Sequence, residues 1–291
     1  MTEILQYIVS GISMGSAYAL IAIGFNLIYN SSGIINFAQG EFVMLGGMGS
    51  YYFYSILHFP LFLAILSGIL LAGFIGILIE RLTVRPVRFQ SPMILIIITI
   101  GVSIFIRGTA MLLWDKNSHV LPSFSGNKPI EFLGAAIFSQ HIWIFAVSII
   151  VMLILGWFFK YTILGKAILA CSLDPLAARL MGINVEQMTM YSFGISAMIS
   201  GIAGALMTPV TLTSYDVGIL LGLKGFAAAI VGGLGRMSGA FIGGITLGLI
   251  EALGAGVISS GYKDAITFGV LLLVLYLRPQ GIIGEAKVDR V

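Results

Sequence analysis

The chain has 291 residues, of which 58% are hydrophobic and only 9% are charged, whereas soluble domains carry about 25% charged residues. This composition excludes an ordinary soluble protein and predicts an all-α, multi-pass membrane protein. The net charge of +3 is dispersed along the chain, which argues against nucleic-acid binding, and the single Cys171 excludes a disulfide framework.

Apolar stretches of about 20 residues, the length that crosses the hydrocarbon core, recur along the whole chain. They predict about eight to nine membrane-spanning helices in a single domain, residues 1–291. The stretches lie near residues 4–29, 41–58, 60–80, 92–113, 141–160, 188–208, 219–234, 238–258 and 262–278.

The basic residues between these stretches predict which side faces the cytoplasm, because Lys and Arg accumulate there. Ten fall on one side and four on the other, with one left inside a stretch. The ten are Arg81, Arg85, Arg88, Lys160, Lys166, Arg179, Arg236, Arg278, Lys287 and Arg290; the four are Lys116, Lys128, Lys224 and Lys263. We therefore expect an external N-terminus, a cytoplasmic C-terminus, an external loop at 114–140 and a cytoplasmic loop at 160–187.

Glycine is unusually frequent in the apolar stretches, with 37 residues in the chain. Small residues four apart let two helices approach closely, so we expect tight helix packing at several of them. The sites are Gly11, Gly15, Gly235, Gly239, Gly243 and Gly248. The clusters at 46–49 and 232–235 allow a second interpretation, in which helices break beside a polar cavity. Their similar surroundings hint at an internal repeat.

Polar residues inside the stretches need an explanation, because a charge at the bilayer centre costs about 2.5–3.5 kcal/mol on insertion scales. Thr99, Ser103 and Arg107 recur four residues apart and form a polar stripe on one helix face. Arg107 either extends outward to the membrane interface or pairs with Glu251, which lies near a close-packed glycine face.

A second polar group, Asn36, Gln39 and Glu41, surrounds the start of the second stretch. One interpretation is a solvated cytoplasmic turn. The other is a partly inserted segment that lines, together with Thr99 and Ser103, a translocation pathway for a small polar or zwitterionic solute. Hydroxyl and amide groups suit such a pathway because they replace water without holding the solute tightly.

No motif supports an enzyme. His58, His119 and His141 lack metal-ligand spacing, and neither a nucleophile elbow nor a phosphate-binding loop occurs, since Gly165-Lys166 is followed by Ala167. We therefore expect no catalytic residue, no cofactor and no bound metal. If ATP drives transport, another subunit must hydrolyse it.

The segment 160–187 contains one well-defined short helix. Asp174 is suited to cap it, Pro175 to occupy its first position, and Gly182 to follow its end in the left-handed conformation. These residues predict a two-turn helix over 175–181. Such a helix either connects two membrane spans or presents a rigid surface to a partner.

Several ordered motifs resemble the LivH-type permeases of branched-chain amino acid ABC importers, over essentially the full length. They are Gly24-Phe-Asn-Leu-Ile-Tyr29, Ile35-Asn-Phe-Ala-Gln-Gly-Glu41, Met44-Leu-Gly-Gly47, Lys166-Ala167, Asp174-Pro-Leu-Ala-Ala-Arg-Leu-Met-Gly-Ile-Asn184, Ser200-Gly-Ile-Ala-Gly204, Gly232-Gly-Leu-Gly235 and Arg278-Pro-Gln-Gly281.

The resemblance implies a multi-pass subunit of the bacterial inner membrane. Its partners would be a second, LivM-type permease chain, two cytoplasmic ATPases and an external substrate-binding protein. The short helix would dock on an ATPase, through Asp174, Ala177, Ala178, Arg179 and Gly182. Leu176 stands where the broader importer consensus has Glu, so that salt link is absent. A permease for urea or short amides and a passive channel remain the alternatives.

Overall fold

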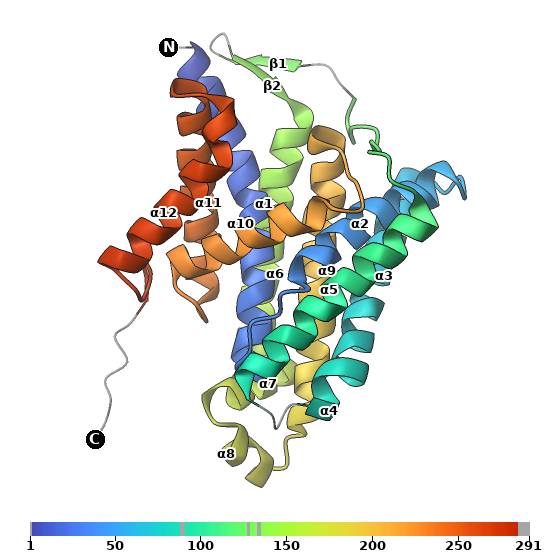
Figure 1. Ribbon diagram of the computed structural model, residues 1–291, viewed down its shortest axis with the longest axis vertical. Helices are drawn as coiled ribbons and strands as arrows, with labels where there is room; N and C mark the ends of the chain where they lie inside the picture. Colours follow the sequence, from blue (N-terminus) through green and yellow to red (C-terminus); the bar gives the residue numbers. More distant parts are fainter. Residues whose placement is uncertain (1, 88–90, 127–128, 133–134, 285–291) are drawn as a thin grey trace.

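A computed structural model describes residues 2–87, 91–126, 129–132 and 135–284 (Figure 1). These residues are mostly helical. The helices are α1 (Thr2–Ser32), α2 (Gln39–Ser55), α3 (Leu61–Ile79), the π-helix η1 (Glu80–Val84), α4 (Arg85–Val87), α5 (Pro92–Trp114), α6 (Ser139–Tyr161), α7 (Ile163–Leu173), α8 (Pro175–Leu180), α9 (Val185–Thr211), α10 (Val217–Gly232), α11 (Met237–Val257), the 3₁₀-helix η2 (Ser260–Tyr262) and α12 (Lys263–Leu277). Strands β1 (Pro129–Phe132) and β2 (Ala135–Phe138) form an antiparallel hairpin that pairs Ile130 with Ile137.

The all-α, multi-pass architecture predicted from composition is confirmed. Seven helical segments among the described residues are long and apolar enough to cross a membrane. They are α1, α3 with η1 and α4, α5, α6, α9, α11, and η2 with α12. Helices α2 and α10 have 17 and 16 residues and are therefore only about 25 Å long, short of a core of about 30 Å.

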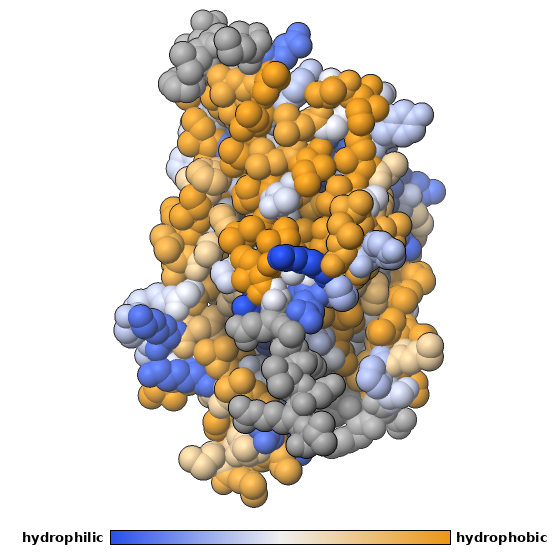
Figure 2. All heavy atoms as spheres, turned by 90° about the vertical axis from the view of Figure 1, so that its left-hand side faces the viewer, coloured by the Kyte–Doolittle hydropathy of each residue, from blue (hydrophilic) through white to orange (hydrophobic). Residues whose placement is uncertain are grey.

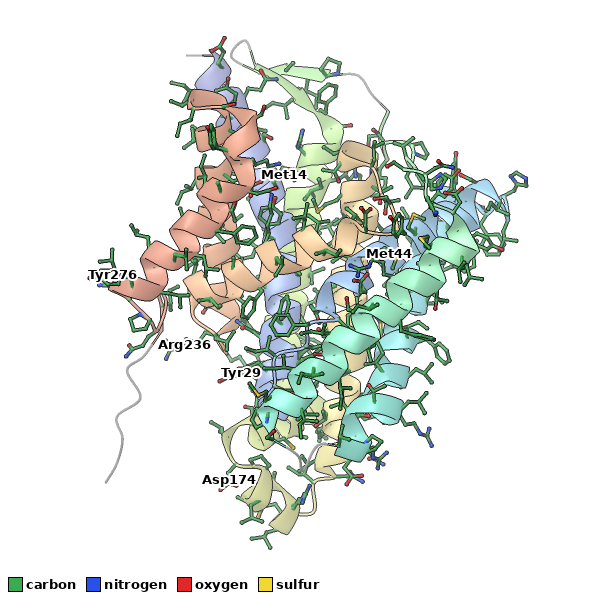
Figure 3. All side chains as sticks on the ribbon, viewed as in Figure 1. Met14, Tyr29, Met44, Asp174, Arg236 and Tyr276 are labelled. Atoms are coloured by element: carbon green, nitrogen blue, oxygen red, sulfur yellow. The ribbon has the colours of Figure 1, made fainter. Side chains whose placement is uncertain are left out.

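The two long loops lie at opposite ends of the bundle (Figure 1). The β1–β2 hairpin lies beside the N-terminus, whereas α7 and α8 lie at the far end, where Figure 3 labels Asp174. This separation agrees with the expectation that 114–140 and 160–187 face different sides of the membrane. Arg88, Lys128, Lys287 and Arg290 lie outside the described residues.

Helices α1 and α11 pack in antiparallel fashion with their backbones almost in contact. A Cβ atom built on Gly248 would lie 2.3 Å from the Cα of Gly15, and one on Gly244 would lie 2.6 Å from the Cα of Ala19. No side chain fits at those distances. The glycine spacing read from the sequence thus lies at a real helix contact, as do Gly239 and Gly243, which lie against α10.

The outer surface of the bundle is apolar. Leu272, Leu273 and Leu277 of α12 are exposed, and Tyr276 is 87% exposed and points away from the bundle (Figure 3). Figure 2 shows that hydrophobic side chains cover much of the face that carries α12. Helices α1 and α9 have most of their residues buried, so they form the centre of the bundle. A surface of this kind suits lipid or another apolar partner.

A helix break coincides with only one of the two glycine clusters. Residues 46–49 remain helical inside α2, and the break instead precedes that helix, where Gly33 takes a φ of +71°. At 232–235 the break occurs, with φ of +113° at Gly233 and +89° at Gly235. Gly235 therefore serves a turn rather than a helix contact: its N–H donates to Asn26 Oδ1, and its carbonyl accepts from Asn30 Nδ2.

Glu251 does not pair with Arg107. Its Oε1 accepts bonds from Lys224 Nζ at 3.1 Å and Tyr18 Oη at 3.0 Å, and also contacts Lys263 Nζ at 3.1 Å; its Oε2 accepts from Thr267. Lys224 also contacts Asp264 at 2.7 Å. Lys224 was counted as an external basic residue, but it is buried within α10, so it carries no information about sidedness.

Candidate functional site

A cavity of about 260 Å³ lies where α1, α2, α5 and α10 meet. Its lining combines one acid, one base and one hydroxyl with aromatic and aliphatic side chains. The lining residues are Phe25, Phe37, Glu41, Ile100, Ser103, Ile104, Arg107, Gly218, Ile219, Gly222, Leu223 and Phe226. Ile100, Ile104 and Ile219 are partly exposed, so the cavity reaches the outer face formed by α5 and α10, the near side of Figure 1.

Glu41 is the acid of this cavity and is only 1% exposed. Its Oε1 accepts a hydrogen bond of 2.7 Å from Ser103 Oγ. Its Oε2 has no hydrogen-bond partner among the described residues. Leaving a buried polar atom unpaired is costly, so this oxygen is a candidate ligand contact.

Glycines bring the backbones of α2 and α10 together beside Glu41. A Cβ on Gly40 would lie 2.0 Å from the carbonyl oxygen of Gly218, and one on Gly222 would lie 2.8 Å from the Cα of Gly40. A Cβ on Gly218 would lie 3.0 Å from Glu41 Oε2. The absence of side chains at these positions therefore gives the carboxylate access to the α10 side of the cavity.

The five sequence-predicted pathway residues are all brought to this region, but they do not share one environment. Glu41 and Ser103 line the cavity. Gln39 is fully buried, and its Nε2 donates to Ser196 Oγ at 2.9 Å and Ser200 Oγ at 2.7 Å, which attaches the start of α2 to α9. Asn36, Gln39 and Glu41 are all buried, so the solvated-turn interpretation does not describe them.

Asn36 and Thr99 organise the non-helical segment before α2. Asn36 Oδ1 accepts from the N–H of Ala38 at 3.1 Å, while its buried Nδ2 has no partner among the described residues. Thr99 Oγ1 accepts from the N–H of Phe37 at 3.2 Å and donates to the carbonyl of Ile96. Thr99 thereby attaches this segment to α5, and it does not line the cavity.

Arg107 is a cavity residue that the sequence-based pathway prediction did not include. It lies one turn after Ser103 on α5 and is half-buried beside the same space as Glu41. The signal was present in the stripe of Thr99, Ser103 and Arg107, because a spacing of four residues, about one turn of helix, places successive members on one face. What the sequence lacked was the position of α2, which brings Glu41 opposite that face.

Helix α8 forms as its sequence predicts, with its last helical residue at Leu180. Asp174 Oδ1 accepts from the N–H groups of Leu176 at 2.8 Å and Ala177 at 3.0 Å, and Gly182 takes a φ of +82°. These contacts satisfy the first free N–H groups of the helix and terminate it after two turns.

The faces of α8 differ in what they contact. Ala178 is 4% exposed because it packs against the rest of the chain, so its side chain is not available to a partner. Leu180 is 83% exposed, Met181 is equally exposed, and Leu176, Ala177, Arg179 and Gly182 are also exposed. The exposed surface of this helix is therefore mainly apolar, and Arg179 contributes a positive charge to it.

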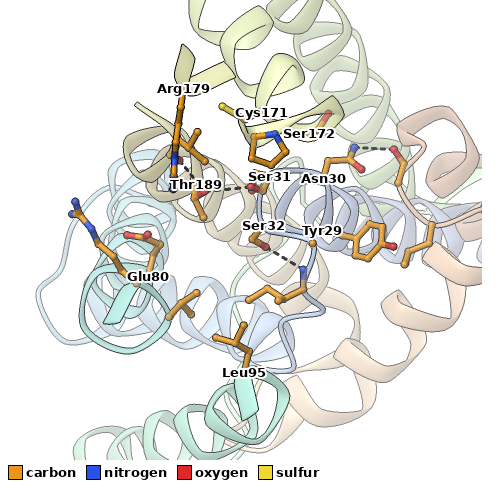
Figure 4. Close-up of a pocket in the computed structure, with 18 of the residues that line it drawn as sticks. Tyr29, Asn30, Ser31, Ser32, Glu80, Leu95, Cys171, Ser172, Arg179 and Thr189 are labelled. Atoms are coloured by element: carbon orange, nitrogen blue, oxygen red, sulfur yellow. Dashed lines mark hydrogen bonds between the residues drawn. The ribbon is translucent and has the colours of Figure 1, made fainter. Parts of the chain in front are cut away.

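A larger cavity, about 590 Å³, lies between α8 and the end of α1 (Figure 4). Its lining includes Glu80, Arg179 and Thr189, and Thr189 Oγ1 lies 3.3 Å from the carbonyl of Ser31. Cys171 also borders it, and burial raises the pKa of this thiol. Because Pro175 and Arg179 belong to the lining, a displacement of α8 would change the shape of this cavity.

The family model described as "Branched-chain amino acid transport system / permease component" matches residues 7–275. The chain belongs to this permease family. The permease is 38% identical to the high-affinity branched-chain amino acid transport system permease protein LivH of Escherichia coli (strain K12), over 99% of this chain and 97% of that protein. It is 37% identical to the corresponding protein BraD of Pseudomonas aeruginosa, over 99% and 98% of the two chains.

Among solved structures, the permease is similar to PsaBC from Streptococcus pneumoniae in complex with Fab, with a TM-score of 0.51 and 16% identity. The match covers 96% of this chain and 93% of that one. At this identity the likeness shows a shared fold only. It agrees with the helical, multi-pass architecture of the permease.

Proposed function

We propose that this permease is the membrane-spanning subunit of an ATP-driven ABC importer for branched-chain amino acids. The observation that carries the proposal is the 38% identity to LivH over nearly the full length of both chains. The protein is a transport subunit of the inner membrane rather than an enzyme. Its importer contains a further permease chain, ATPase subunits and a binding protein, and we propose that the second permease is of the LivM type.

The end of the bundle that carries the β1–β2 hairpin and the N-terminus is proposed to face outward, and the α8 end to face the cytoplasm. This follows the asymmetry of basic residues. In a Cys171→Ser background, a cysteine at Ser125 should react with an impermeant thiol reagent added outside, and a cysteine at Ser172 only with reagent added inside. The reverse pattern would contradict both the orientation and the role of α8.

The solute pathway is proposed to run past Glu41 and Ser103, with Asn36, Gln39 and Thr99 holding the segment that shapes it. The cavity beside Glu41 reaches the outer face of α5 and α10, where opening a space lined by two charged side chains to lipid would be costly. We infer that the second permease chain covers this face. The pathway would then lie between the two chains, enclosed on both sides.

ATP hydrolysis is proposed to reach the membrane through α8. Leu176, Leu180 and Met181 form an exposed apolar surface on a helix that is capped at both ends and therefore rigid. Such a surface can insert into a groove of the ATPase. Because Ala178 packs against the permease itself, movement of α8 would pass directly to the neighbouring helices.

The test is uptake by the reconstituted importer. The permease, its partner chain, the ATPases and the binding protein are placed in proteoliposomes, and labelled leucine is supplied outside with ATP inside. We expect leucine accumulation that requires both ATP and the binding protein. Equilibration of leucine without nucleotide would indicate a passive channel, and ATP-dependent uptake of urea in place of leucine would indicate the other alternative.

A further inference from the structure

The cavity beside Glu41 contains an unsatisfied acceptor. Glu41 Oε1 is occupied by Ser103, but Oε2 is buried and has no partner among the described residues. This oxygen lies beside Gly218, where α10 presents only backbone. A buried carboxylate normally keeps all its hydrogen-bonding capacity engaged, so the free oxygen indicates a place for a cationic donor that the chain itself does not supply.

The same cavity contains a positive charge. Arg107 follows Ser103 by one helical turn and lines the cavity, yet it forms no ion pair with Glu41. The two charges are therefore kept apart within about 260 Å³ of space. This volume lies just under the range of about 300–1,000 Å³ for drug-sized ligands, so it suits a smaller solute. A pair of separated opposite charges matches a solute that is itself a dipole.

The rest of the lining is apolar. Phe226 packs on Phe25 with ring centroids 5.5 Å apart and on Phe37 with centroids 5.8 Å apart, which forms an aromatic wall. Ile100 and Leu223 add aliphatic surface. This wall can bury a branched hydrocarbon side chain, but it offers no hydrogen bonds to a sugar or to urea.

We propose that this cavity is a transient binding site that recognises the zwitterion of an aliphatic amino acid. Glu41 Oε2 accepts from the ammonium group, the Arg107 guanidinium donates to the carboxylate, and the aromatic wall contacts the side chain. The proposal rests on the proposed function and extends it: the permease itself selects for solutes that carry both charges, in addition to any selection by the binding protein.

The experiment measures ligand contact with the complete complex of permease chains and ATPases, without the binding protein, by saturation-transfer NMR in lipid nanodiscs. Three probes share one side chain: leucine, 4-methylpentanoate, which lacks the ammonium group, and 3-methylbutylamine, which lacks the carboxylate. Glu41→Gln should weaken leucine binding about tenfold but should not weaken the binding of 4-methylpentanoate, which has no ammonium group to lose a partner. Arg107→Gln should also weaken leucine binding but should not weaken the binding of 3-methylbutylamine.

Glu3→Gln is the matched control, because it removes one negative charge from the exposed first turn of α1 without altering the cavity lining. It should leave all three probes unchanged. Absence of leucine contact with the wild-type complex would overturn the proposal. Equal weakening of all three probes in either cavity variant would also overturn it, since that pattern indicates a structural role.

ATP-driven leucine uptake separates this inference from the proposed function. If the wild-type importer accumulates leucine while Glu41→Gln and Arg107→Gln importers accumulate it at the same rate, the cavity does not recognise the zwitterion, yet the importer assignment stands. If the wild-type importer accumulates no branched-chain amino acid, the proposed function itself is wrong.

Discussion

Two carboxylates are each 1% exposed within the bundle, and their surroundings differ completely. Glu251 on α11 is surrounded by donors: Lys224, Lys263 and Tyr18 at one oxygen and Thr267 at the other. Glu41 on α2 has one donor, Ser103, and one oxygen with no partner among the described residues. The carboxylate of Glu251 therefore has hydrogen-bond or ionic partners at both oxygens, whereas the carboxylate of Glu41 has a partner at only one. We call the first a satisfied cluster and the second an incomplete one.

This difference indicates which region is built for stability and which for function. A satisfied buried cluster fixes the relative positions of the helices that contribute to it, here α1, α10, α11 and α12. An incomplete cluster beside a cavity costs folding free energy unless a ligand completes it, and such a cost is characteristic of binding sites. Helix α10 contributes to both regions, with Lys224 on one face and Gly218 and Gly222 on the other.

The largest stability effect is expected at Glu251. Replacing it with Gln removes the negative charge that Lys224 and Lys263 share, and breaking a buried ion pair costs about 3–5 kcal/mol. The midpoint of thermal unfolding of the purified permease should fall steeply. The double variant Glu251→Leu with Lys224→Met should lose less stability than Glu251→Gln, because it removes both charges of the pair together. Equal stability of wild type and Glu251→Gln would show that the cluster does not hold the helices together.

A smaller loss of stability is expected from disrupting the contact between α1 and α11. A methyl group on Gly248 would lie 2.3 Å from Gly15, so Gly248→Ala forces the two backbones apart, at about 1–3 kcal/mol. Gly269→Ala on α12 is the matched control, since a Cβ there meets no atom within 4 Å, and it should be neutral or slightly stabilising. Thermal unfolding of both variants checks the comparison. Similar stability for the two would contradict a close contact at Gly248.

The sequence predicted local features well and spatial pairings poorly. The caps of α8 and the glycine contacts at Gly239, Gly243 and Gly248 follow from short-range chemistry and are present where they were expected, whereas Gly235 lies in a turn. The partners of Glu251 and the position of Arg107 beside Glu41 depend on which helices meet after long separations in the chain, such as Tyr18 with Glu251. The break before α2 was also misplaced, because glycines at 46–49 that contact α9 and α3 tolerate a continuous helix as readily as a broken one.

The next largest effect on stability is expected at the cap of α8, and it should be confined to that helix. Asp174→Ala removes the acceptor for the N–H groups of Leu176 and Ala177, which costs about 1 kcal/mol of helix stability. The permease should still fold, but the ATPase should co-purify in lower yield and leucine uptake should fall. Asp174→Asn retains a capping oxygen and should behave like the wild type. Unchanged ATPase recovery with Asp174→Ala would make α8 a simple connector.

The smallest effect is expected from a third acid, Asp115, which lies at the surface. The N–H of Asn117 donates to its carboxylate at 2.6 Å and lowers its pKa, with His119 as a further contact. The stability it contributes is therefore present above its unfolded pKa of about 3.9 and is lost as the pH falls through the lower folded value. The protection factors of the amides in the 115–119 segment, that is, their exchange rates relative to the intrinsic rate at each pH, should stay constant from neutral pH down to mildly acidic pH. A change near neutral pH would contradict this assignment.

The central claim is that Glu41 serves the solute and Glu251 serves the fold, and one paired measurement on Glu41→Gln tests it. Thermal unfolding of the permease and ATP-driven leucine uptake per assembled importer are measured on the same preparation. We predict an unfolding midpoint equal to or above that of the wild type, together with a fall in uptake of about tenfold. A lowered midpoint with wild-type uptake per assembled importer would contradict the claim, because it would place Glu41 in the structural class of Glu251.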